Sequence, residues 1–275
     1  MNWQIFKFSN FQILLIAAAL ALTAALYFAP KKTISTAAPA ASRLPEFDLL
    51  LNDAKASLKR EEVEIVAPLE ARLKTEPGNF LLLDSLGKRW DALQMPAIAA
   101  HYYELMAENK PDEKSWINAA YRYFDAYKIS GDSTVRAMMV QKAISSYEKV
   151  LKFNPENLDA KTDLGVCYAE GTNEPMRGIM LLREVVTKNP QHENAQFNLG
   201  LLSMKSGQYD KAAERFEKVL AINPQRKELY LMAGRAYMMA GKNDKARESF
   251  EKLKKESSDP ALAEQATNYI NQIHD

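Results

Sequence analysis

The chain has 275 residues, with 36 Lys and Arg against 35 Asp and Glu, so its net charge is close to zero. This balance gives no support for binding to nucleic acid, because proteins that bind nucleic acid usually carry a basic stripe on their surface. The single cysteine, Cys167, excludes an internal disulfide framework and any metal site built from several cysteines. Only 10 Gly and 12 Pro interrupt the chain, which indicates long helices joined by short turns.

The N-terminal segment is expected to cross a membrane. Residues 8–30 carry no charged side chain, and residues 13–28 are almost wholly apolar. With aromatic residues at both ends, this stretch reaches the roughly 20 residues that span a bilayer core. We therefore predict a single-pass signal anchor over residues 1–30. A cleaved signal peptide is the alternative, although small residues suited to cleavage occur only around Pro39, far downstream of the apolar run.

The side of the membrane on which the rest of the chain lies is left open by the charges. Lys7 precedes the apolar run and Lys31 and Lys32 follow it, which leans slightly toward a cytoplasmic C-terminal part. A short N-terminal tail before a signal anchor usually stays in the cytoplasm, which favours the periplasmic side. We expect a location in the inner (cytoplasmic) membrane with a periplasmic C-terminal part. Residues 31–45 are rich in Ala, Ser, Thr and Pro and read as a flexible tether with a reach of roughly 20 Å.

A set of marker residues recurs beyond the tether. Gly200, Ala212, Phe216 and Pro224 return 34 positions later or earlier as Gly234, Ala246, Phe250 and Pro190. Earlier stretches supply the same pattern in the form of Gly165, Tyr168, Gly178 and Leu182, and before them Gly87, Trp90, Ala99, Tyr103 and Pro111. Small residues allow two helices to approach closely, aromatic residues fill the space between pairs, and Pro ends the second helix.

A 34-residue period with these markers resembles the tetratricopeptide repeat, a helix-turn-helix unit. The resemblance implies an all-α solenoid of antiparallel helix pairs. It covers a degenerate first unit (46–79) and five repeats (80–260). A C-terminal cap helix (261–275) is expected to follow the last repeat. The five repeats have the bounds 80–113, 114–157, 158–192, 193–226 and 227–260. In the first unit, Pro68 is expected to interrupt the second helix.

The repeat at 114–157 carries an insertion of 11 residues, and three helical turns need about 10.8 residues. We therefore predict added helix instead of added loop, with Asp132 or Ser133 as the cap of a helix that runs to about Phe153. The start of this helix, with Val135, Met138 and Met139, is expected to protrude beyond its neighbours. A disordered internal loop is the alternative.

No catalytic pattern appears in the sequence. His101, His192 and His274 fall far apart in a solenoid, where each unit touches only its neighbours, and Cys167 reads as a small buried hydrophobe. The turn at 171–178 lacks the Gly-Lys-Ser/Thr of a phosphate loop. We predict that the protein is not an enzyme and holds no cofactor and no metal.

One face of the first helices is predicted to bind partners. Positions 5, 9 and 12 of each unit share a face turned by about 100° from the packing markers. This face is charged at Asp84, Lys88 and Asp91 and becomes apolar and Met-rich further along. The predicted partner-binding residues are Tyr121, Phe124, Val166, Phe197, Leu201, Met204, Arg235 and Met238. The alternative is that these side chains pack against neighbouring helices.

The function is expected to be that of a membrane-tethered scaffold or assembly factor that binds apolar or amphipathic protein segments. The tandem stretches around Gly165 and Gly200 also resemble the membrane-anchored tetratricopeptide repeat subunits of bacterial cytochrome c assembly. This resemblance implies the alternative function, a chaperone-like holder of unfolded clients. Self-association of the chain is left open.

Overall fold

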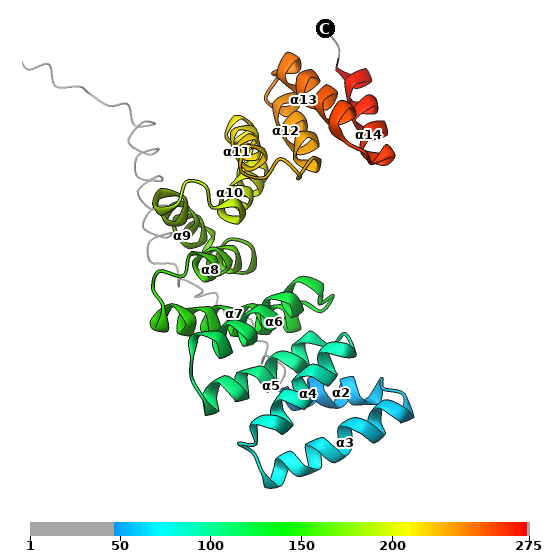
Figure 1. Cartoon of the computed structure of the whole chain (residues 1–275), viewed down its shortest axis with the longest axis vertical. Helices are drawn as coiled ribbons and strands as arrows, with labels where there is room; N and C mark the ends of the chain where they lie inside the picture. The colour runs from blue at the N-terminus through cyan, green and yellow to red at the C-terminus, as the bar shows by residue number, and fades with distance from the viewer. Residues whose placement is uncertain (1–46, 274–275) are drawn as a thin grey trace, which may run out of the picture. The chain divides into compact units, whose positions relative to one another are not determined.

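The computed structural model describes residues 47–273 of the chain, all within one compact unit. These residues form 13 α-helices and no strand, so the all-α prediction is confirmed for this part of the chain. Figure 1 shows helices α3 to α14 following one another in chain order, whereas α2 packs on α5. Their bounds are α2 Phe47–Ala56, α3 Arg60–Thr75, α4 Phe80–Ala92, α5 Pro96–Asn109, α6 Glu113–Ile129, α7 Ser133–Phe153, α8 Leu158–Gly171, α9 Pro175–Lys188, α10 Glu193–Lys205, α11 Tyr209–Ile222, α12 Glu228–Met239, α13 Asn243–Glu256 and α14 Pro260–Gln272.

The predicted membrane anchor at 1–30 and the tether at 31–45 lie outside the described residues, as does His274. Between residues 47 and 273, no helix combines the length and the apolar character that a membrane crossing requires.

Short polar signals start and stop the helices. Asn79, Asp112, Asp132 and Asn157 each accept a hydrogen bond from a backbone N–H in the first turn of the helix that follows. Such caps satisfy donors that have no partner inside the helix. Helices α5, α9 and α14 begin with Pro, which needs no N–H partner at that position. The turns therefore stay short, and from α3 onward each helix packs against the next one along the chain.

The marker residues form the core. Phe216 and Phe250 are fully buried, as the repeat register predicts. The buried apolar residues of the described chain fall into two clusters, one that ends at Leu199 and one that begins at Ala212. The C-terminal helix α14 closes the second cluster, where the Tyr269 ring stacks on Phe250 at 5.1 Å between centroids.

The 11-residue insertion is helical, as predicted, and lengthens both helices of its pair. Helix α7 has 21 residues where α5, α9, α11 and α13 each have 14, and α6 has 17 where α4 has 13. The expected cap at Asp132 is present. The expected protrusion is wrong for Met138 and Met139, which are 8% and 1% exposed. The longer α6 covers the start of α7, so these two methionines belong to the core.

The first two helices depart from the expected unit. Helix α3 continues through Pro68, so the expected interruption is wrong. Pro68 is exposed, and water can therefore satisfy the carbonyl that loses its N–H partner. Helix α2 packs on α5, where the Phe47 ring stacks on the His101 ring at 3.6 Å between centroids.

Helices α8 and α9 approach each other through two glycines. A Cβ atom on Gly178 would lie 2.2 Å from the carbonyl oxygen of Gly165 and 2.5 Å from the backbone nitrogen of Ala169. Both obstructing atoms belong to the backbone of α8, so they cannot move aside as a side chain can. Gly178 is therefore required by the spacing of this helix pair.

We predict that Gly178→Ala destabilises the protein by about 1–3 kcal/mol, the usual cost of overpacking. The loss is expected although Ala gains about 1 kcal/mol in helix propensity over Gly. Urea unfolding followed by circular dichroism measures the difference. Gly131→Ala is the matched control, because a Cβ atom there meets nothing within 4 Å. Equal stability of the two variants would contradict the close approach of α8 and α9.

Candidate partner-binding surfaces

The structure divides the eight predicted partner-binding residues into a buried and an accessible group. Phe124 and Val166 are 6% and 5% exposed and belong to the first core cluster. The expectation that these two side chains lie on an open face is therefore wrong. Helix α8 buries nine of its 14 residues, so it has no free first-helix face. Phe124 lies beside Tyr127 at 6.1 Å between ring centroids, on the longer α6.

Tyr121 lies about one helical turn before Phe124 on α6 and, unlike Phe124, is accessible, with 50% of its surface exposed. Its ring lies 6.0 Å from the Arg122 guanidinium, which forms an ion pair of 2.8 Å with Asp91. Lys88 and Asp84 also pair with each other at 2.7 Å. The charged start of the predicted face is thus internally paired, which leaves little charge there for a partner.

The remaining predicted residues lie together on α10 and α12. Phe197, Leu201 and Met204 on α10 and Met238 on α12 are half-buried and pack against the second core cluster. Leu231 of α12 is also half-buried and packs against the second core cluster, whereas Arg235, one helical turn further along α12, is exposed. We call this set the C-terminal face: Phe197, Leu201, Met204, Leu231, Arg235 and Met238.

Two cations lie at the C-terminal face, Arg235 within it and Arg226 beside it. The Arg226 guanidinium lies 4.4 Å from the centroid of the Phe197 ring, and the Arg235 guanidinium lies 5.9 Å from the Tyr269 ring of α14. Phe197 also sits 6.2 Å from the core ring of Phe216. Each apolar side chain therefore has one side in the fold and one side accessible. Such a face can accept an apolar segment without a large rearrangement.

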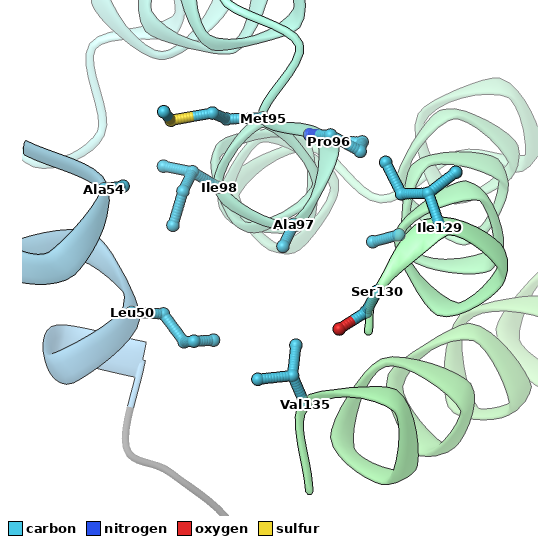
Figure 2. A pocket seen from close by; sticks show the side chains of 10 residues that line it. Leu50, Ala54, Met95, Pro96, Ala97, Ile98, Ile129, Ser130 and Val135 are labelled. Carbon is cyan, nitrogen blue, oxygen red and sulfur yellow. The ribbon is translucent and has the colours of Figure 1, made fainter. Parts of the chain in front are cut away.

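An apolar pocket of about 290 Å³ was missed by the sequence reasoning. Figure 2 shows Leu50 of α2, Ile98 of α5 and Val135 of α7 around the same space, with Ile129 and Ser130 at the end of α6. Ser130 is the one polar residue in the lining. The signal was present in the sequence, because Ile129 and Val135 flank the turn of the extended pair. Their convergence with α2 depends on packing that the repeat pattern does not encode.

The residues with catalytic or metal-binding potential have structural surroundings. Cys167 is fully buried, and burial raises the pKa of its thiol far above the usual range. His192 caps α10 by accepting a hydrogen bond of 3.3 Å from the Ala195 N–H, while its Nε2 lies 3.2 Å from an Asp159 carboxylate oxygen. Over residues 47–273, no three His, Cys, Asp or Glu side chains gather in a metal-binding group. The absence of catalysis stays a prediction.

His101 joins α2 to α5. Its imidazole stacks on Phe47, and burial lowers its pKa to about 4, while the nearby Glu104 carboxylate opposes this shift. The folded state therefore favours the neutral imidazole, whereas the unfolded chain takes up a proton near pH 6.5. The contribution of neutral His101 to the stability of the fold is fully present above pH 6.5. It is lost as the pH falls toward 4, because His101 of the unfolded chain then binds a proton that His101 of the folded chain does not.

We predict that His101→Phe, which keeps an aromatic ring against Phe47, reduces the loss of stability on acidification. The measurement compares urea midpoints at pH 7 and pH 5 for both proteins. The drop should be larger in the parent chain than in the variant. Identical drops would show that His101 is not held neutral by its surroundings.

Comparisons with known proteins agree on the fold. A family model described as Tetratricopeptide repeat matches residues 203–266. No curated protein matches the chain in sequence. Among solved structures, a tetratricopeptide repeat protein from Parabacteroides merdae ATCC 43184 is similar with a TM-score of 0.53 at 21% identity, over 82% of this chain and 88% of that one.

Two further structures are similar over most of their own length. The MamA protein has a TM-score of 0.51 at 21% identity and covers 69% of this chain and 94% of its own. PilW, described as a widely conserved type IV pilus biogenesis factor, has a TM-score of 0.51 at 18% identity, over 79% of this chain and 94% of its own. At these identities the likeness shows the fold alone.

Proposed function

We propose that this tetratricopeptide repeat array is the partner-binding part of a membrane-tethered scaffold or assembly factor. The observation that carries the proposal is the C-terminal face, where accessible apolar side chains line the first helices of two successive pairs. Tetratricopeptide repeats have no chemistry in common, but stacked helix pairs present extended surfaces for other proteins. The description of PilW as a biogenesis factor supports this reading only in that the fold occurs in a protein of that kind.

The composition of the C-terminal face favours a protein segment as its ligand. Met204 and Met238 have flexible, polarisable side chains that adapt to partners of different shape. Arg235 is exposed and adds a donor that can pair with a carboxylate or a backbone carbonyl at the edge of the apolar surface. An amphipathic helix or an extended apolar segment meets both requirements.

The membrane tether rests on the uncharged run at 8–30. An anchor followed by a 15-residue tether would keep the array near the bilayer while it turns freely. Partners of such a scaffold would be membrane proteins or proteins that assemble at the membrane surface. We place the array on the periplasmic side of the inner membrane as part of this proposal.

We predict that Met204→Asp combined with Met238→Asp lowers partner capture at least tenfold. A buried carboxylate opposes an apolar partner, and the two positions lie on neighbouring first helices. The measurement is affinity capture from detergent-solubilised membranes with quantitative mass spectrometry. Met180→Asp is the matched control, because Met180 is 68% exposed on α9, outside the C-terminal face.

Circular dichroism melting accompanies this capture experiment, because the two methionines are half-buried. Arg235→Glu, at an exposed position, tests the same face without a carboxylate in the core. Capture of the same proteins by both folded variants would contradict the proposal. Loss of many weakly bound proteins, in place of one or two stable partners, would instead favour the chaperone-like alternative.

We also predict that the mature chain keeps residues 1–30 and stays in the membrane fraction after a carbonate wash. The reason is the long uncharged run and the lack of a suitable cleavage site close behind it. Intact mass of the purified protein checks the start of the chain. A mature protein that begins near Ser42 would contradict the anchor, and protection of the array from protease added to spheroplasts would contradict its periplasmic side.

A further inference from the structure

A second surface lies between helices α9, α10 and α11. It is a cleft of about 520 Å³ whose lining combines cationic side chains of α9 and α11 with apolar side chains and with the polar residues Ser203, Ser206 and Gln208. We call it the basic cleft. Its cations are Arg183, Lys211, Arg215 and Lys218, its one carboxylate is Glu214, and its apolar lining is Met176, Ile179, Leu199 and Leu202.

The cations of the basic cleft have no carboxylate partner within residues 47–273, unlike their neighbours. On the same helix α9, Arg177 pairs with Glu148 at 3.2 Å and Lys188 pairs with Glu156 at 2.8 Å. Arg183 and Lys218 are exposed and take part in no such pair in this part of the chain. Burial, followed by the positive charge of Arg183, lowers the pKa of Arg215. The Glu214 carboxylate opposes this shift. The cleft therefore holds four cations against one carboxylate.

Arg215 is held in place by a buried amide. Gln196 is 2% exposed, and its side-chain nitrogen donates a hydrogen bond of 2.6 Å to the carbonyl oxygen of Pro190. This bond fixes the amide so that its oxygen accepts a hydrogen bond from Arg215. A guanidinium has five N–H donors, so others remain for a ligand. The fold thus orients a cation at the cleft before any ligand arrives.

The apolar side chains in its lining distinguish the basic cleft from a site for a simple anion. Met176 is 63% exposed, and Ile179 and Leu202 are half-buried, so apolar surface lies directly beside the cations. Inorganic phosphate would leave this surface uncovered, and nucleic acid favours a long basic stripe that a chain of net charge +1 does not offer. A segment with carboxylates beside an apolar side chain covers both parts of the cleft.

We propose that the basic cleft binds an acidic peptide segment of a partner protein. The carboxylates of the segment pair with Arg183, Arg215 and Lys218, and its apolar side chain lies on Ile179 and Leu202. The cations of the cleft come from the second helices α9 and α11, and helix α10 adds Leu199 and Leu202. The C-terminal face uses other residues of α10, together with residues of α12, so the two surfaces share a helix but no residue. The array therefore has two separate binding surfaces, and the test of one is independent of the other.

The experiment measures fluorescence anisotropy of a labelled peptide with the purified full chain in detergent. The probe is a nonapeptide with a central pair of Leu flanked by Asp and Glu. Two analogues accompany it, one with Asn and Gln in place of the acids and one with Ser in place of the Leu pair. Both analogues are expected to bind at least fivefold more weakly than the probe.

The matching variants separate the cleft from general charge. Arg183→Gln combined with Lys218→Gln is expected to weaken probe binding at least tenfold, and both positions are exposed, so the fold is kept. Lys254→Gln combined with Lys255→Gln removes the same charge from exposed positions of α13 and is expected to leave binding within twofold. Arg215→Ala is expected to weaken binding of the acidic probe peptide. It is expected to leave partner capture through the C-terminal face unchanged.

Three results would overturn the proposal. Equal losses in the two double variants would show attraction by net charge alone. Equal binding of the probe and its Ser analogue, with displacement by inorganic phosphate at the same concentration of negative charge, would show a simple anion site. Tighter binding of a double-stranded DNA oligonucleotide than of the probe would assign the cleft to nucleic acid.

Discussion

The close approach of the two helices in each pair is the constraint on which the rest of the array depends. A Cβ atom placed on Gly87, Gly200 or Gly234 would lie 3.0, 2.7 and 2.5 Å from the ring of Tyr103, Phe216 and Phe250, respectively. The aromatic ring of the second helix thus packs directly on the glycine of the first helix, in the space that a side chain would otherwise fill. With the spacing of the pair fixed in this way, the same ring can also contact the next helix along the chain, as Phe250 does when it stacks on Tyr269 of α14. Close packing of the core therefore continues from one helix pair to the next.

Tyrosine hydroxyls add a polar link between neighbouring helices. Tyr123 donates to Glu104 at 2.6 Å, and Tyr168 donates to Glu148 at 2.9 Å, in each case to the second helix of the preceding pair. The Glu104 carboxylate, 7% exposed, also receives the Lys142 ammonium at 2.8 Å. Polar groups this deep are costly unless they are satisfied, so these links fix one orientation of each pair against the next. Tyr168 was recognised from the sequence as a marker residue, but its hydrogen-bond partner was not.

The repeat period was sufficient to predict the helix pairs and the cores around Phe216 and Phe250, because these features depend on local spacing. The length of α7 followed from counting turns. The burial of Phe124, Met138 and Met139 could not be predicted in the same way, because it results from the insertion lengthening α6 as well as α7. A register that ignores this lengthening assigns the affected side chains to the surface.

The two surfaces that the repeat pattern does not encode have a similar explanation. The apolar pocket needs α2 to lie on α5, although α2 is the helix that departs most from the repeat. The basic cleft combines residues of α9 and α11 that are about one repeat apart and carry no shared marker. Only the first-helix face has a fixed period, and for this reason it was the one surface that sequence reasoning could propose. Its use by a partner stays a prediction, and the burial of Val166 removes that residue from the face.

The division of the core into two clusters makes α10 a shared wall. Leu199 belongs to the first cluster and Leu202 packs against it, whereas Phe197, Leu201 and Met204 pack against the second. A helix used from both sides is the natural point for cooperativity to break, so each half can open while the other stays folded. A segment held in the basic cleft would touch α9 on one side of this boundary and α11 on the other. Occupancy would then act as a clamp, so that the two halves open and close as a single mechanical unit.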